Sequence, residues 1–320
     1  MNLPKRPAMV REAAEKGGQK WYLEILIFLG VFLVGGLMES FPSVFLEFFR
    51  ARQTGDLLPS GNVPDWYMIA SLFATGLMTV TVILFCRLVQ KRDGRSLGFR
   101  REGAIREYLV GALVGTAMFA LAALICVITG TMTLSANRFS VGVWILYLVG
   151  FLIQGMSEEV LCRGYFMVSV ARKNSLWLAV LLSSLAFSLL HIFNSGVTPL
   201  ALFNIFLFGV VMSLYVLRRG NLWGVCAVHS LWNFVQGNVF GVSVSGTGSG
   251  ASPLAATLTE QGKIWNGGAF GAEGGLAVTI VLLLAIAVLL FVVRNGKNTD
   301  EKQAAAAVSE PSDGYDPFEA

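Results

Sequence analysis

The feature of the sequence that most constrains the fold is a series of apolar segments, each about 20 residues long and separated by short polar connectors. An α-helix rises about 1.5 Å per residue, so about 20 apolar residues are what a helix needs to cross the hydrocarbon layer of a membrane. The chain is 55% hydrophobic and only 14% charged, and its mean hydropathy is +0.65. These values exclude an ordinary water-soluble domain. We therefore predict an all-α fold, a polytopic transmembrane helix bundle.

Eight apolar segments can be drawn in the sequence, so we expect about eight spans. They cover residues 21–49, 66–89, 108–129, 141–170, 176–193, 199–217, 222–240 and 276–293. The first is too long for the apolar part of a signal peptide and lacks a clear small-residue cleavage site, so we expect it to be retained. All four cysteines lie within apolar segments at no metal-site spacing, which predicts small buried residues and no disulfide framework.

Basic residues gather in alternate connectors, as the positive-inside rule requires of a membrane protein. One side receives Lys5, Arg6, Arg11, Lys16, Lys20, Lys91, Arg92, Arg95, Arg100, Arg101, Arg106, Arg172, Lys173, Arg218, Arg219, Arg294 and Lys297. The other side holds only Arg50, Arg52, Arg138 and Lys263. This asymmetry predicts a multi-pass plasma membrane protein with both termini cytoplasmic. The basic residues form no continuous stripe, so the lipid bilayer, and not nucleic acid, is the expected partner.

The composition divides the chain into three parts. We expect a basic cytoplasmic N-terminal segment over residues 1–20, a membrane domain over 21–294 and a disordered cytoplasmic tail over 295–320. Within the membrane domain, residues 242–275 are rich in Gly and Ser, which predicts an external loop.

Ionisable residues are costly within a membrane helix, so those that persist there are candidates for function. Three clusters stand out. The fourth segment contains Glu158-Glu159-Val-Leu-Cys-Arg163, the fifth contains Phe187-Ser-Leu-Leu-His191, and the seventh contains His229-Ser-Leu-Trp-Asn233. The two histidines are the only ones in the sequence.

Helical spacing assigns provisional roles to these side chains. Glu159 and Arg163 are four residues apart and share a face, which predicts an intrahelical ion pair whose role is mainly structural. Glu158 is rotated about 100° from Glu159 and is left to face a cavity. His229 and Asn233 share a face, and Phe187 lies one turn before His191, where its ring can brace the imidazole.

Such a set supports hydrolysis by an activated water. Glu158 with His191 would deprotonate and orient the water. Attack on a peptide carbonyl generates an oxyanion, which donors held in a dry site stabilise strongly. His229 and Asn233 are suitable donors. The catalytic prediction is therefore Glu158, His191, His229 and Asn233, supported by Glu159 and Arg163.

The three motifs resemble those of the CPBP family, also called CAAX proteases and bacteriocin-processing enzymes or the ABI family. This family includes the type 2 CAAX prenyl endopeptidases, and its pattern is Glu-Glu-x-x-x-Arg, Phe-x-x-x-His and His-x-x-x-Asn or Asp in that order. The resemblance covers residues 141–241 and implies a CAAX-protease-like core and the same roles for the four residues. It also implies an endopeptidase that acts on a membrane-associated peptide or lipidated protein. No metal is obligatory in this reading, although members are often described as metalloproteases.

Other readings stay open at this stage. Glu158, His191 and His229 could instead supply the three ligands of a catalytic zinc. A non-catalytic scaffold or a bacteriocin-immunity protein could retain the same pocket for binding, although retention of all four polar residues favours the enzyme. A transporter is disfavoured because no matching broken half-helices are evident. The sequence has no His-Glu-x-x-His zinc motif, and its nearest match to a rhomboid-type serine motif lies in a loop.

Overall fold

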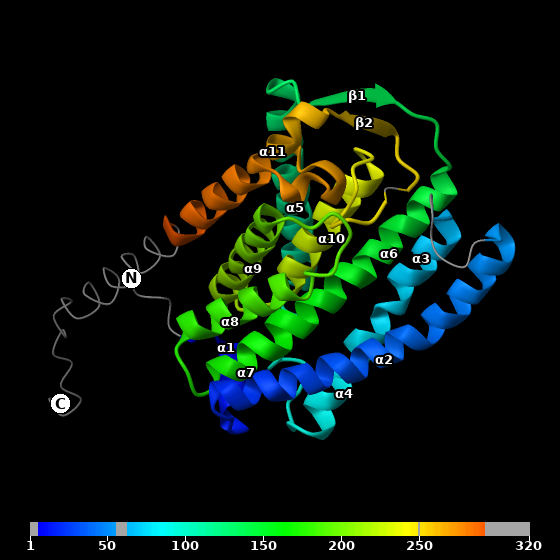
Figure 1. Ribbon diagram of the computed structural model, residues 1–320. Coiled ribbons are helices and arrows are strands. Elements are labelled where there is room, and N and C mark those ends of the chain that lie inside the picture. The colour runs from blue at the N-terminus through cyan, green and yellow to red at the C-terminus, as the bar shows by residue number, and fades with distance from the viewer. Residues whose placement is uncertain (1–5, 56–62, 249, 292–320) are drawn as a thin grey trace, which may run out of the picture.

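The computed structural model describes residues 6–55, 63–248 and 250–291. The predicted tail at 295–320 lies outside the described residues, and so does the end of the last apolar segment. Figure 1 shows an elongated bundle of helices, with a small two-stranded sheet at one end. In the described ranges all eight predicted apolar segments are largely helical, so the all-α membrane bundle is confirmed.

The helices follow one another in chain order, and the longest connection lies between α10 and the last helix. They are α2 (Trp21–Thr54), α3 (Asp65–Ala74), α4 (Gly76–Leu88), α5 (Ala104–Ile128), α6 (Val141–Glu159), α7 (Val168–Ala171), α8 (Leu176–Leu189), α9 (Pro199–Arg219), α10 (Trp223–Asn238) and a last apolar helix, Leu276–Phe291. A π-helical turn, η1 (Val160–Met167), joins α6 to α7 without a break. Side-chain oxygens of Ser140, Ser175 and Thr198 cap the starts of α6, α8 and α9 by accepting backbone N–H bonds.

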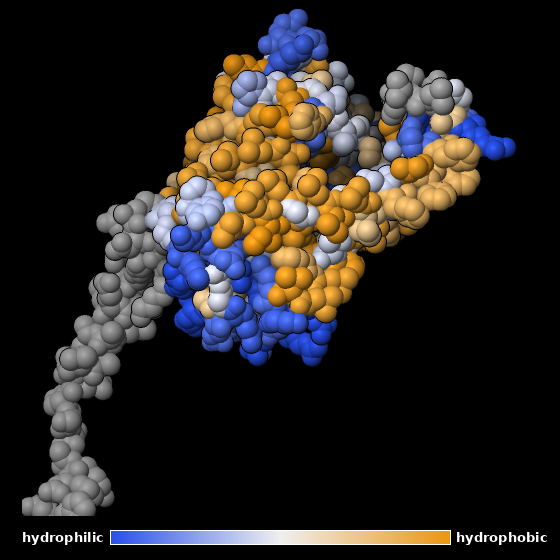
Figure 2. Space-filling view, turned by 60° about the horizontal axis from the view of Figure 1, so that its bottom comes forward, coloured by the Kyte–Doolittle hydropathy of each residue, from blue (hydrophilic) through white to orange (hydrophobic). Residues whose placement is uncertain are grey.

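The surface of the bundle is that of a membrane protein. Within the described ranges, five helical stretches are long and apolar enough to cross a membrane, among them Trp21–Gln53 and Val141–Ala171. The outer face of α2 is covered with exposed apolar side chains, and Phe41 is 71% exposed. Figure 2 shows a broad hydrophobic region between hydrophilic ends. Lipid satisfies such a surface and water does not, so the chain is a multi-pass membrane protein.

Glycines let α5 and α6 approach α10 closely. A Cβ atom on Gly115 of α5 would lie 2.2 Å from the carbonyl oxygen of Val228, and one on Gly155 of α6 would lie 2.5 Å from Ser230 Oγ. Small residues at such contacts allow backbones to pack directly in a membrane. Because Val228 and Ser230 flank His229, these two contacts set the position of that histidine.

One predicted span is interrupted and another ends early, although the first, Asp65–Leu88, is still long and apolar enough to cross the membrane. The segment predicted at 66–89 is interrupted at Thr75, between α3 and α4, and the Thr75 carbonyl accepts a hydrogen bond of 2.7 Å from Ser157 Oγ. The segment predicted at 176–193 stops being helical after Leu189. The apolar run continues past the helix end, so hydropathy does not mark it, and Phe193 is 97% exposed in the turn that follows.

The N-terminal segment and the predicted external loop, both outside the predicted spans, contain regular structure. Residues 1–20 include a short helix, α1 (Ala8–Glu15), which buries Met9, Val10 and Ala13. In the predicted external loop, β2 (Leu254–Leu258) pairs antiparallel with β1 (Met132–Ala136). The short helices η2 (Glu260–Gly262), α11 (Lys263–Asn266), η3 (Gly268–Phe270) and η4 (Ala272–Gly274) complete this loop. The four cysteines are buried and free, as expected.

Candidate active site

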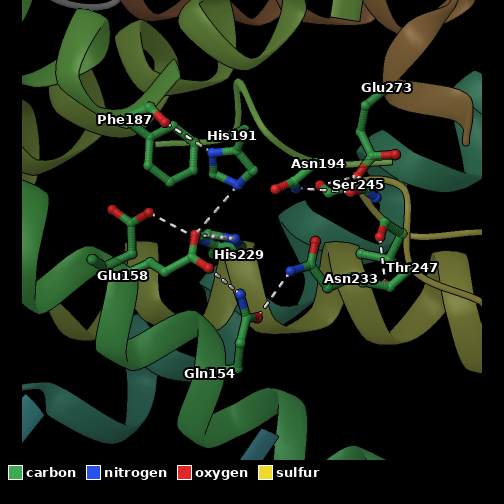
Figure 3. Close-up of polar contacts among 12 residues, drawn as sticks. Gln154, Glu158, Phe187, His191, Asn194, His229, Asn233, Ser245, Thr247 and Glu273 are labelled. Atoms are coloured by element: carbon green, nitrogen blue, oxygen red, sulfur yellow. Dashed lines mark hydrogen bonds and ion pairs between the residues drawn. The ribbon is translucent and has the colours of Figure 1, made fainter. Parts of the chain in front are cut away.

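The four predicted catalytic residues line one cavity. Glu158 comes from the end of α6, while His229 and Asn233 come from α10. His191 lies in the turn after α8, not within a helix as its place in the fifth predicted span implied. Figure 3 shows the side chains of these elements pointing toward one another. Tertiary packing therefore assembles residues that are 75 positions apart in the sequence.

The carboxylate of Glu158 occupies the centre of the group. Its Oε2 atom lies 3.7 Å from Nε2 of His229 and 4.0 Å from Nε2 of His191. Both distances are too long for a direct hydrogen bond but suit a single bridging water. Within the described chain Oε2 is buried without a hydrogen-bond partner, while the side chain as a whole is 29% exposed. One oxygen of the carboxylate is thus directed at both imidazoles.

His191 is held by a contact that fixes its tautomer. Its Nδ1 atom lies 2.8 Å from the carbonyl oxygen of Phe187, which can only accept, so Nδ1 carries the proton. In the neutral ring Nε2 is then free to accept a hydrogen bond, and this atom faces Glu158. The Phe187 ring packs edge-on to the imidazole at a centroid distance of 5.0 Å. The expected brace is present.

The ion pair predicted between Glu159 and Arg163 is present and fully buried, with Oε1 of the carboxylate 3.0 Å from the arginine Nη1. The same Oε1 atom lies 2.9 Å from Nδ1 of His229, on another helix. The guanidinium of Arg163 also lies 4.3 Å from the ring centroid of Phe187. Glu159 therefore contacts His229 directly, and Arg163 contacts the Phe187 ring that packs on His191. Residue spacing within one helix does not reveal these contacts between elements.

Gln154 is part of the cavity, although the sequence motifs did not single it out. Its Nε2 atom donates to Oε1 of Glu158, and its Oε1 atom accepts a hydrogen bond of 3.0 Å from Nδ2 of Asn233. Gln154 precedes Glu158 by one helical turn. The spacing of four residues between two polar side chains in an apolar helix is the sequence signal that identifies it.

The loop between α10 and the last helix covers the cavity. Val244, Ser245 and Thr247 line it, and Nδ2 of Asn194 donates to the Ser245 carbonyl at 2.8 Å. Oε1 of Glu273 accepts bonds from the backbone N and the Oγ of Ser245, at 3.2 and 3.0 Å, and Oε2 accepts one from Gln236. Burial raises the pKa of Glu273 and these donors lower it in part, so that the pKa is about 7.

A second recess reaches the same carboxylate from the side of α2. It is lined by Glu39, Thr75 and Met78, and by Glu158 and His191 themselves. Glu158 is thus bordered by two hollows, one beneath the covering loop and one between α2 and the turn after α8. Glu39, to which the sequence assigned no role, is an acidic side chain in this second recess.

The same side chains are those that the alternative of a metal site would use. Among the described residues, no group of three His, Cys, Asp or Glu side chains is arranged to hold a metal ion. Nδ1 of each histidine is engaged, that of His191 with the Phe187 carbonyl and that of His229 with Glu159, while Nε2 of each faces Glu158. Metal-binding histidines carry such bonds on their other ring nitrogen, so these contacts do not count against a metal. Zinc liganded by Glu158, His191 and His229 is the alternative to activation of water without a metal.

Comparison with known proteins bears on the region around this site. The model of a family described as "Type II CAAX prenyl endopeptidase Rce1-like" matches residues 140–235. Searches of curated proteins and of solved structures gave no significant match. The matched stretch begins at the cap of α6, ends within α10 and overlaps most of the predicted core at 141–241. The resemblance to the CAAX proteases is thus confirmed over residues 140–235, which are similar to the Rce1-like family.

Proposed function

We propose that the protein is an intramembrane endopeptidase that hydrolyses a peptide bond near the C-terminus of a membrane-associated or lipidated substrate. The observation that carries this proposal is the position of Glu158 Oε2, which faces Nε2 of both His229 and His191 at 3.7 and 4.0 Å. A carboxylate and two imidazoles directed at one water-sized position fit the activation of water. The Rce1-like match over residues 140–235 supports a protease of this family.

In the proposed mechanism Glu158 takes a proton from the bound water as the water oxygen attacks the scissile carbonyl carbon. His191 accepts the second hydrogen bond of the water through Nε2 and orients it. The attack breaks the carbonyl π bond and places negative charge on the carbonyl oxygen. Collapse of the tetrahedral intermediate re-forms the carbonyl and breaks the C–N bond, and the proton held by Glu158 passes to the leaving amine.

His229 and Asn233 are the proposed donors to the oxyanion. Asn233 donates from the N–H of Nδ2 that Gln154 does not use. His229 donates from Nε2 when its ring is protonated, because its Nδ1 already faces Glu159 at 2.9 Å. The buried Glu159 carboxylate stabilises that imidazolium, and donors held in advance in a site of low dielectric stabilise a developing oxyanion strongly.

The asymmetry of basic residues supports a plasma membrane location with both termini cytoplasmic. In that orientation the loop over the cavity, between α10 and the last helix, belongs to the outer side. The active site is then covered on the outer side and reaches α2 within the membrane through the recess that contains Glu39.

The proposal is tested by comparing protein termini in membranes from cells that express the wild type, E158Q or E260Q. Glu260 is an exposed acid outside the cavity, so E260Q is a matched control. We expect new termini with the wild type and E260Q and none with E158Q. An internally quenched CAAX peptide, with and without a farnesyl group, tests the substrate class in detergent. Equal sets of termini from all three proteins would overturn the protease and favour a scaffold or an immunity protein.

A further inference from the structure

Gln154 connects the two halves of the site. Its side chain bonds at one end to Glu158, the proposed base, and at the other end to Asn233, a proposed oxyanion donor. Glu158 lies on α6 and Asn233 on α10, so this single amide spans the gap between the two helices (Figure 3).

The chemistry of the three groups fixes the direction of both hydrogen bonds. An ionised carboxylate only accepts, so Gln154 must turn its NH₂ group toward Glu158. The carbonyl oxygen of Gln154 then faces α10 and can only accept, so Asn233 must turn its own NH₂ group toward it. One N–H of Asn233 is engaged in this bond, at 3.0 Å, and the other remains available to substrate.

We propose that Gln154 is a positioning residue that sets both the free oxygen of Glu158 and the donor face of Asn233. This inference rests on the proposed function for its catalytic meaning. By occupying Oε1 of Glu158, Gln154 leaves Oε2 to face Nε2 of both histidines. The carboxylate charge of Glu158 thereby fixes the orientation of the Gln154 amide, which in turn fixes that of Asn233. The same charge that activates water also orients the group that stabilises the oxyanion.

Two variants separate the two hydrogen bonds. Q154M is close in length to the native side chain but can neither donate to Glu158 nor accept from Asn233. Q154E keeps an acceptor for Asn233 and replaces the donor to Glu158 with a like charge. Gln261 is exposed and lies outside the cavity, so Q261M and Q261E are matched controls.

The decisive measurement does not depend on turnover. The sequence contains only two histidines, so a protein labelled with ¹⁵N-histidine and purified through a tag without histidine gives two imidazole spin systems. We expect Q154M and Q154E to shift the Nε2 resonances, which face Glu158, and to leave the Nδ1 resonances, held by Phe187 and Glu159, close to the wild type. Nε2 resonances that match the Gln261 controls in both variants would overturn the proposal.

Kinetics with the quenched farnesylated peptide gives the second readout. Because Gln154 does not contact the substrate in the proposed role, we expect kcat to fall about 10- to 100-fold and KM to change less than about twofold. Q154M combined with N233A should lower kcat less than the product of the two single effects, because both act on the same donor. A rise in KM with unchanged kcat would instead indicate a residue that binds substrate.

The two experiments also separate this proposal from the proposed function. If the wild type cleaves neither the peptide nor membrane proteins but the Nε2 resonances shift as expected, the positioning role stands and the protease assignment fails. If E158Q abolishes cleavage while both Gln154 variants retain full kcat and wild-type spectra, the protease stands and the positioning role fails. Thermal unfolding of each variant shows that it is folded.

Discussion

Oε1 of Glu159 lies 2.9 Å from Nδ1 of His229, so the second acid of α6 holds a histidine of α10. The same oxygen is 3.0 Å from Arg163, and both members of that ion pair are fully buried. Helical spacing alone suggests that the ion pair of Glu159 and Arg163 serves only packing. The structure places this pair in contact with His229, a proposed catalytic residue. Its removal has consequences for stability and for activity, and these can be measured separately.

Replacing Arg163 with Met should destabilise the protein strongly, because the substitution leaves Glu159 as a buried charge without its cation. Breaking a buried ion pair in this way costs about 3–5 kcal/mol. In E159Q/R163M both charges are absent, so we expect part of the stability to return. Activity should remain low in the double variant, because a neutral amide in place of the Glu159 carboxylate does not stabilise a protonated His229. Thermal unfolding in detergent and peptide cleavage check the two effects. Full activity in the double variant would show that Glu159 serves packing alone.

Chelation should leave cleavage unchanged if water is activated by Glu158 and His191 alone. We expect equal rates for protein treated with 1,10-phenanthroline and for protein treated with the non-chelating 1,7 isomer, with each dialysed into metal-free buffer. Loss of activity that returns on addition of zinc would instead establish the alternative in which Glu158, His191 and His229 bind the ion.

The sequence predicts the bundle well because the length and hydropathy of a segment are enough to identify a membrane helix. It also brings Glu158, His191, His229 and Asn233 together correctly around one cavity. Their catalytic roles stay predictions. Hydropathy does not mark the end of α8, because Leu190, Ile192 and Phe193 remain apolar in the turn that carries His191.

Contacts between helices explain what the sequence could not provide. The bond from Glu159 to His229 and the bridge from Gln154 to Asn233 each join α6 to α10. Spacing within one helix gives the face on which a residue lies but not its neighbour on another helix. For the same reason the sequence does not show that the covering loop belongs to the site, because Ser245 and Glu273 come into contact only in the folded chain.

Gly115→Ala should lower stability and activity together. The added Cβ would lie 2.2 Å from the backbone oxygen of Val228, so α5 and α10 must move apart beside His229. Overpacking of this kind costs about 1–3 kcal/mol. Gly30→Ala is the matched control, because a Cβ there has nothing within 4 Å. Unfolding temperatures and cleavage rates of the two variants test the contact, and equal values for both would show that α10 tolerates the displacement.

The covering loop should lose stability as the pH rises toward neutrality. Burial raises the pKa of Glu273 to about 7 from its ordinary value of 4.5, so the folded state favours the protonated acid more than the unfolded state does. The stabilisation from this group is therefore complete below about pH 4.5 and is lost as the pH rises through about 7. At 1.36 kcal/mol per pKa unit the change is about 3 kcal/mol.

The variant E273Q tests this pH dependence, because its amide cannot titrate. We expect unfolding temperatures between pH 5 and pH 8 to fall less in E273Q than in the wild type. Limited proteolysis should give the same contrast in the covering loop, since the three donors of Ser245 and Gln236 surround the carboxylate that holds it over the cavity. Parallel pH curves for the two proteins would show that the buried acid stays ionised, stabilised by those donors.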